Sequence, residues 1–186
     1  EVVQESPVFK LSIDAADETD LAIIRKHGLL ANPLAKDQPF LVVNAINAPL
    51  ISTKDLADLS RIQDQIVHLK LGNTRVGGDF MKEIAAMPLL ITLDLHHTKI
   101  ADPDLESLKS LAYLESLNLV GTAIGDKGLS ILAKIKSLKR IYLWQTRVTE
   151  KGLKQLRKMR PNVVIQSGFK GRWPLEIDST QVALSK

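Results

Sequence analysis

Apolar residues recur along this chain with a period of 24 residues. Each of four consecutive units opens with two leucines or isoleucines that are separated by one residue, and a threonine follows three residues later. The apolar pairs are Leu69/Leu71, Leu93/Leu95, Leu117/Leu119 and Ile141/Leu143, and the threonines are Thr74, Thr98, Thr122 and Thr146. A unit this short cannot bury its own apolar face, so the repeat predicts a stack of similar units, a solenoid.

Within each unit the spacing of the apolar residues changes from two to three. The period of two is typical of a strand with one buried face, whereas the spacing of three is close to one helical stripe. The last position of this stripe, where we expect burial, holds Met87, Leu111, Ile135 and Met159. Because a helix carries the chain back to each new strand, neighbouring strands must be parallel and each crossover right-handed. The predicted fold is therefore an α/β right-handed repeat solenoid, with a parallel sheet on one wall and helices on the other.

The repeat also divides the chain into segments. We expect an N-terminal capping segment over residues 1–40, a degenerate first repeat over 41–65, four regular repeats over 66–161, a last strand over 162–167 and a C-terminal tail over 168–186. The degenerate repeat matches the helical positions of the others with an offset of 25 residues instead of 24.

Shorter elements are predicted before the regular repeats. Alternating residues predict a strand over 8–13 and another over 40–44, and a helix over 20–27 ends at Gly28. Ser52, with an acid three residues later, resembles a capping box at the start of the first repeat's helix.

Polar residues mark the turns and helix starts of the repeats. Asp102 and Asp126 lie where a helix N-cap is expected, Pro103 follows at the first helical position, and Glu150 has the same place in the fourth unit. The threonine column predicts a structural role, because a small hydroxyl side chain can satisfy backbone groups in a narrow turn. A residue repeated in every unit is not typical of a catalytic nucleophile.

The composition fits one continuous core that is packed mainly by leucine. The 186 residues are 45% hydrophobic but only 4% aromatic, which favours a solenoid over a sandwich. The chain has no cysteine, which excludes disulfides and thiol chemistry. No apolar run is long enough to span a bilayer, so we expect no membrane segment in this chain.

The sequence lacks the motifs that carry catalysis. The glycine-rich stretch over 72–78 has no Lys-Ser or Lys-Thr pair and is interpreted as a turn. Alternating acids over 102–106 lack the glycine and the bidentate glutamate of a calcium loop, and we interpret them as helix-start charges. His96 and His97 are adjacent, so they point to different environments, whereas zinc needs three or four converging ligands. We expect no enzyme activity, no metal and no cofactor in this chain.

Two levels of family resemblance are visible. The unit L-x-L-x-x-T-x-[VI]-x-D-x-x-L-x-x-L-x-x-L resembles a leucine-rich repeat of the ribonuclease-inhibitor or F-box-associated type. The stretches LWQTRVT (143–149) and RPNV (160–163) more specifically resemble the last repeat of modules that planctomycete-like and Bacteroidetes-like bacteria attach to membrane proteins bearing a c-type cytochrome domain. Residues 11–35 are similar to the segment that precedes the repeats in those proteins, so the resemblance covers residues 8–168.

The resemblance implies a periplasmic or otherwise extracytoplasmic module of a larger, cytochrome-associated protein. The sequence contains no C-x-x-C-H motif, so we expect any haem or membrane domain to lie upstream of this chain. A cytosolic substrate receptor like the F-box proteins is a further alternative, but the chain has no F-box-like segment.

The residues that flank the buried apolar pairs form the open wall of the predicted sheet. The fourth unit places arginine, tyrosine and tryptophan there, and these types are enriched in binding hot spots. We interpret the wall as a surface that binds a protein or peptide, with the candidate residues Lys70, Asp94, His96, Asn118, Val120, Arg140, Tyr142 and Trp144. The alternative is that the C-terminal tail or a neighbouring domain covers Trp144.

Charge is unevenly distributed, although the formal net charge is only +4. Residues 127–172 contain thirteen Lys or Arg and the single acid Glu150, whereas residues 1–126 contain eleven bases and eighteen acids. The basic half suggests an alternative function, the binding of a polyanion such as nucleic acid or an anionic surface. The bases of the fourth helix lie where solvated residues belong, without an aromatic stacking platform, so we favour protein recognition and expect no nucleic-acid partner.

Overall fold

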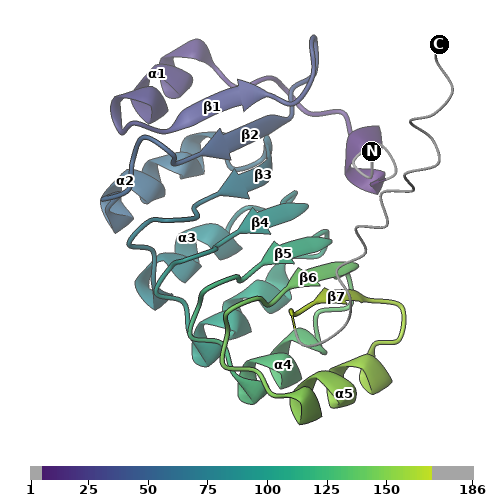
Figure 1. Cartoon of the computed structure of the whole chain (residues 1–186). Helices are drawn as coiled ribbons and strands as arrows, with labels where there is room; N and C mark the ends of the chain where they lie inside the picture. The colour runs from purple at the N-terminus through teal and green to yellow at the C-terminus, as the bar shows by residue number, and fades with distance from the viewer. Residues whose placement is uncertain (1–5, 169–186) are drawn as a thin grey trace, which may run out of the picture.

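The computed structural model describes residues 6–168. One curved sheet forms one side of the molecule, and helices lie along the opposite side (Figure 1). Within this range seven strands lie in chain order: β1 (Leu30–Pro33), β2 (Leu41–Asn44), β3 (Ile66–Lys70), β4 (Thr92–Asp94), β5 (Ser116–Asn118), β6 (Arg140–Tyr142) and β7 (Val164–Gln166). The opposite wall carries α2 (Thr53–Ala57), η3 (Asp58–Ile62), η4 (Gly78–Phe80), α3 (Met81–Ala85), η5 (Asp102–Ser110), α4 (Asp126–Leu132) and α5 (Glu150–Met159). The architecture is the predicted α/β solenoid.

The apolar pairs of the four regular repeats lie in register. Leu69 pairs with Leu93, Leu93 with Leu117, and Leu117 with Ile141, always between parallel strands. The prediction of parallel neighbouring strands is therefore confirmed. All four side chains are at most 1% exposed and belong to one core that continues from repeat to repeat. Each apolar side chain thus packs against its counterparts in the adjacent repeats, which one isolated unit could not provide.

The threonine column closes the turn after each strand, as predicted. Each hydroxyl donates to the backbone carbonyl three residues earlier, at 2.6 Å for Thr74, Thr98 and Thr122 and 2.8 Å for Thr146. The residue before each threonine has a positive φ angle, a backbone conformation that asparagine and glycine adopt most readily. These residues are Asn73 (59°), His97 (51°), Gly121 (69°) and Gln145 (55°).

The prediction that Asp102 and Asp126 cap their own helices is wrong. The N-cap residues are Ala101 and Gly125, and the two acids are the first residues of η5 and α4. Their carboxylates instead reach into the following repeat, where Asp102 Oδ1 accepts from the N–H of Gly125 at 2.7 Å. The prediction failed because each acid lies one residue inside its helix, and its carboxylate bonds to a backbone N–H of the next repeat instead.

Asp126 makes the same contact one repeat later. Its Oδ1 accepts from the N–H of Thr149 at 2.8 Å, and its Oδ2 accepts from the Thr149 hydroxyl at 2.7 Å. These bonds lower the pKa of Asp126 from its ordinary value of 3.8, the hydroxyl bond being the larger cause and the backbone bond the next. Gly152 provides the space, because a Cβ atom there would overlap the Asp126 carboxylate. The acids therefore fasten successive repeats together on the helical side.

The N-terminal segment differs from the prediction at one element. Residues 8–13 are not a strand, since Pro7–Lys10 forms the 3₁₀ helix η2. Proline suits the first helical position, and the buried Val8 packs in a second cluster with Phe40, Val67, Leu89 and Ile91. Contacts with distant repeats thus outweigh the local alternation.

The other N-terminal elements follow the prediction more closely. Helix α1 (Glu18–Lys26) precedes Gly28, whose φ angle is 77°, and the Ser52–Asp55 capping box is present. Strand β1, which the alternation did not predict, pairs antiparallel with β2. It therefore covers the edge that the first parallel strand would otherwise expose.

Met159 also departs from the prediction of a buried helical position. It is 52% exposed, whereas its counterparts Met87, Leu111 and Ile135 are 1–2% exposed. Each counterpart is followed by another helix-bearing repeat, but α5 is the last helix in the described range. A side chain at this position is therefore buried only where a further helix-bearing repeat follows and covers it.

Replacing Leu119 by alanine should destabilise the fold by about 2–5 kcal/mol, because this fully buried side chain would leave a cavity between two repeats. The measurement is the free energy of unfolding from denaturant titration. The matched control is Leu50→Ala, since Leu50 is 65% exposed and should change stability by less than about 0.5 kcal/mol. Equal effects of the two substitutions would contradict the assigned register.

Acid should weaken the Asp126 link between repeats. Its pKa is lower in the folded chain, so its contribution to stability is present above pH 3.8 and is lost as the pH falls through the lowered value. The Asp126→Asn variant has no carboxylate at this position to titrate. It should be less stable than the unsubstituted protein at neutral pH, and this difference in stability should shrink as the pH falls through this range. Urea titrations of both proteins across this pH range measure the difference, and a constant difference would refute the assigned role.

Candidate functional site

The outward side of the sheet, which we call the strand wall, carries the predicted site residues in ordered rows. The strand register places Lys70 beside Asp94, Asp94 beside Asn118, and Asn118 beside Tyr142. The same register puts Asn44 of β2 beside Lys70. Five side chains from five neighbouring strands therefore form one row.

Two of the predicted residues also have a structural part in the turns. The side-chain oxygen of Asp94 accepts from the N–H of His96 at 3.1 Å, and that of Asn118 accepts from the N–H of Val120 at 3.1 Å. Asn44 makes the equivalent bond to the N–H of Ile46 at 2.9 Å. Each bond orients the strand end and the residue that follows it. Sequence reasoning missed Asn44, although an asparagine at the end of a predicted strand, just before the turn, was a usable signal.

His96 is held between two side chains at the edge of the strand wall. Its Nδ1 lies 2.7 Å from Asp94 Oδ1, and its Nε2 lies 2.8 Å from the Asn73 amide nitrogen. Because an amide nitrogen donates, Nε2 must accept, and Nδ1 carries the proton that it donates to Asp94. The neutral imidazole satisfies both contacts.

The two adjacent histidines lie over different glycines. A Cβ atom at Gly72 would overlap the His96 ring, whereas a Cβ atom at Gly121 would overlap the His97 ring. One ring therefore leans toward the preceding repeat and the other toward the following one. The prediction that they point to different environments is confirmed.

A cleft of about 390 Å³ opens at this end of the strand wall. Three predicted residues, Lys70, Asp94 and His96, line it together. The other lining residues were not predicted, and they are Asn44, Ala45, Ile46, Pro49, Gly72 and Asn73. Burial, followed by the nearby Lys70 charge, lowers the pKa of His68 below its usual value of 6.5. The charged form of His68 is therefore disfavoured, partly by Lys70 two residues further along the strand.

The remaining predicted residues lie toward the other end of the strand wall, outside this cleft. Arg140 and Tyr142 are half-buried, and Trp144 is 40% exposed. Gly168, with a φ angle of 65°, packs against the indole, because a Cβ atom there would come within 2.7 Å of the ring. The predicted alternative, a cover of Trp144 by the tail, concerns residues 169–186, which lie outside the described range. The structure thus separates the eight candidates into two groups on one surface.

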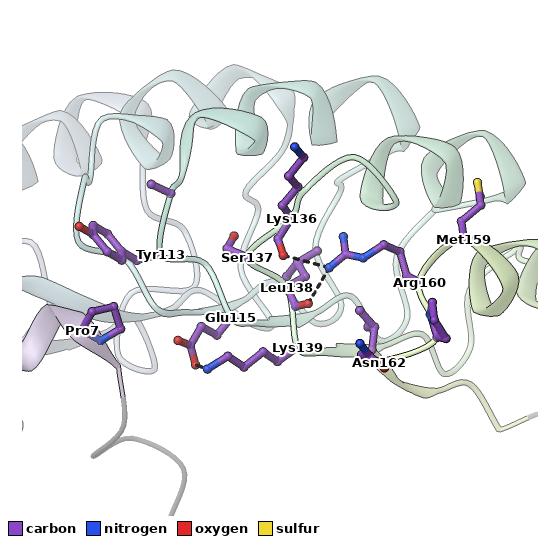
Figure 2. A pocket seen from close by; sticks show the side chains of 13 residues that line it. Pro7, Tyr113, Glu115, Lys136, Ser137, Leu138, Lys139, Met159, Arg160 and Asn162 are labelled. Carbon is purple, nitrogen blue, oxygen red and sulfur yellow. Dashed lines mark hydrogen bonds and ion pairs between the residues drawn. The ribbon is translucent and has the colours of Figure 1, made fainter.

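A larger groove of about 710 Å³ lies at the opposite ends of the strands, between Pro7 and Asn162 (Figure 2). Two of the three cationic residues that line it, Arg160 and Lys139, are already engaged. The Arg160 guanidinium donates to four backbone carbonyls at 2.6–3.2 Å, and the Lys139 ammonium lies 3.0 Å from the Glu115 carboxylate. Arg160 therefore satisfies the open carbonyls at the end of the preceding repeat, a structural function.

Residues 6–168 include no cluster of three or more histidine, cysteine, aspartate or glutamate side chains that could hold a metal. In the same range no helix has the length and apolar character needed to cross a membrane.

Comparisons with known proteins concern the fold. No protein-family model matches the sequence, and no curated protein matches it significantly. Among solved structures, an internalin from Listeria monocytogenes is 20% identical with a TM-score of 0.47, over 63% of this chain and 32% of that chain. The leucine-rich-repeat ectodomain of the receptor kinase SOBIR1 from Arabidopsis thaliana is 19% identical with a TM-score of 0.47, over 85% and 95%. A leucine-rich-repeat protein of Leptospira interrogans is 18% identical with a TM-score of 0.42, over 63% and 34%.

This chain therefore spans about a third of the length of the internalin and of the Leptospira protein. Because their TM-scores are below 0.5, these similarities do not establish the fold of this chain. The strand register, the threonine column and the 24-residue unit define the fold as a leucine-rich-repeat solenoid.

Substituting Gly72 by alanine should displace the His96 ring from between Asp94 and Asn73, because the new methyl group would occupy its place. The change in stability should be small, about 1 kcal/mol or less, since the ring is the mobile end of a side chain. Nitrogen-15 NMR of the imidazole measures the tautomer, which should change from one form to a mixture. The Gly77→Ala variant is the control, and an unchanged His96 spectrum in Gly72→Ala would refute the contact.

Proposed function

We propose that the strand wall binds an extended segment of a protein or peptide partner without catalysing a reaction. The single observation that carries this proposal is the continuity of the wall between two distinctive ends. At one end Lys70, Asp94 and His96 line a cleft, and at the other Trp144 is 40% exposed beside Tyr142. A repeated surface of this kind suits an elongated ligand better than a compact one.

The dimensions of the wall support a short linear epitope. Lys70 on β3 and Tyr142 on β6 are separated by three strand spacings, about 14 Å at 4.8 Å per strand. An extended peptide advances about 3.3 Å per residue, so roughly four to five residues span this distance. One peptide could therefore reach both ends at once.

We further propose that the chain is a recognition module of a larger extracytoplasmic protein associated with a c-type cytochrome domain. The support is the sequence resemblance of residues 8–168 and nothing in the strand wall itself. Reading the gene upstream for a C-x-x-C-H motif and membrane spans tests this part separately. An upstream region without either feature would refute it and leave the recognition function in place.

Trp144 should be a hot spot of the proposed interaction. Linear peptides selected from a random display library on the full chain supply the ligand, and calorimetry supplies its affinity. Trp144→Ala should weaken binding by about 2 kcal/mol, roughly thirtyfold, because it removes the largest side chain at this end of the wall. The melting temperature should change little, since the side chain is partly exposed in the described structure.

Variants on the helical side provide the matched control and test the polyanion alternative. Lys151, Lys154 and Lys158 are exposed on α5, away from the strand wall. Replacing all three by serine should leave the affinity of the selected peptide unchanged in 0.5 M salt, a concentration of roughly three times physiological ionic strength. Three results together would favour the polyanion function over our proposal. Heparin would bind tightly, rising salt would abolish heparin binding steeply, and the triple lysine variant rather than Trp144→Ala would lose heparin binding.

A further inference from the structure

Two hydrogen-bond donors meet at the cleft on the strand wall. Asn44 and Lys70 are register partners on adjacent strands, and both line the cleft. The Asn44 side-chain oxygen accepts from the N–H of Ile46, so its amide nitrogen points away from that bond and can donate to a ligand. No carboxylate of the described residues lies within ion-pair distance of the exposed Lys70 ammonium. A ligand therefore meets one amide donor and one unpaired cation side by side.

The acid of the same row also lines the cleft, but one of its carboxylate oxygens is bonded to the turn. Asp94 is the register partner of Lys70, but its Oδ1 accepts from both the N–H and the Nδ1 of His96. The His96 contact to Asn73 completes this chain of hydrogen bonds. Asp94 is thus held toward the turn by its neighbours, and Lys70 remains without an internal counter-ion.

Aliphatic side chains also line the cleft. Ile46 and Pro49 line it, and Ile46 is 70% exposed. Leu50, 65% exposed, lies beyond Pro49 and lines a neighbouring cleft of about 330 Å³. Ile46 and Leu50 are the most exposed large apolar residues in the described part of the chain. The cleft therefore combines an unpaired cation and an amide donor with the exposed aliphatic surface of Ile46.

We propose that this cleft binds an acidic side chain of a partner peptide, with an adjacent aliphatic side chain packed on Ile46 and Pro49. One carboxylate oxygen accepts from Lys70 and the other from the Asn44 amide, a charge-assisted pair of bonds. The aliphatic neighbour removes Ile46 from water. The carboxylate is that of an internal Asp or Glu and not of a chain end, because the strand wall continues past the cleft toward Trp144. This inference rests on the proposed function and names the chemistry that it would recognise.

The test uses capped synthetic peptides and the full chain labelled with nitrogen-15. The probes contain Leu-Glu or Glu-Leu between flexible Gly-Ser residues, with acetylated and amidated ends. The controls replace Glu by Gln, and a separate peptide ends in a free leucine carboxylate. NMR titration should show shifts at Ile46, Lys70, Gly72 and Asn73 with the glutamate probes and at least fivefold weaker binding with the glutamine probes.

Three substitutions set the direction of the effect. Lys70→Ala should weaken the glutamate probe at least fivefold, whereas Lys127→Ala, which removes the same charge from an exposed place on α4, should not. Asn44→Asp keeps the oxygen that accepts from Ile46 but replaces the donor by a like charge, so it should also weaken binding. Asp94→Asn removes the nearest negative charge of the row and should strengthen it.

The outcomes separate this inference from the proposed function. Equal binding of the glutamate and glutamine probes, or equal losses in the Lys70→Ala and Lys127→Ala variants, would overturn the inference. Preferred binding of the free leucine carboxylate would also overturn it, in favour of a chain end. If library-selected peptides still depend on Trp144 in any of these cases, the proposed function stands. If they bind but shift no residue of the strand wall, the proposed function itself fails.

Discussion

The structure depends on a ladder of backbone hydrogen bonds that joins each repeat to the next and continues past the strands into the turns. The N–H of Leu71 donates to the carbonyl of Asp94 at 2.8 Å, and the N–H of Asn73 donates to that of His96 at 2.8 Å. The same two bonds recur one and two repeats later, from Leu95, His97, Leu119 and Gly121. A backbone group buried without a partner is costly, so every repeat must present its carbonyls at the same height. The four regular repeats meet this condition with a constant length of 24 residues, whereas the irregular first repeat meets it through a register shift between Leu41 and Val42.

The turn that follows each strand determines which side chains face solvent. Continuing the ladder requires a positive φ angle at Asn73, His97, Gly121 and Gln145, and the threonine after each of these residues fixes the turn by bonding to the strand end. The residue directly before each positive-φ position is thereby presented at the edge of the strand wall. In the first regular repeat this residue is Gly72, and the His96 ring occupies the space beside it. In the fourth repeat it is Trp144, whose indole lies at the edge. The cleft and the hot-spot candidate are thus two products of one backbone constraint.

The two walls of the solenoid have different means of joining repeats. On the strand side the backbone ladder does most of this, with a side-chain contact between Asn73 and His96 in addition, and Lys70 makes no ion pair among the described residues. On the helical side Asp102 and Asp126 bond across to the next repeat, and Arg160 donates to the carbonyls that end the preceding one. These charged side chains are engaged in holding the stack together. A recognition function is therefore better placed on the strand wall than on the helical side or in the groove beside Arg160.

The sequence by itself determined the main features of the strands and turns that follow from the period. The parallel strands, the buried leucines, the threonine contacts and the row from Lys70 to Tyr142 could be predicted, because each repeats with the unit and needs only the register to be known. Only the tertiary structure decided the features that depend on one contact between distant segments. Val8 enters a second cluster, Asp102 and Asp126 bond to a neighbouring repeat, and Met159 lacks a neighbour to cover it. The cleft belongs to this second kind, since Asn44 and Ile46 come from the irregular first repeat, whose place beside Lys70 no periodicity specifies.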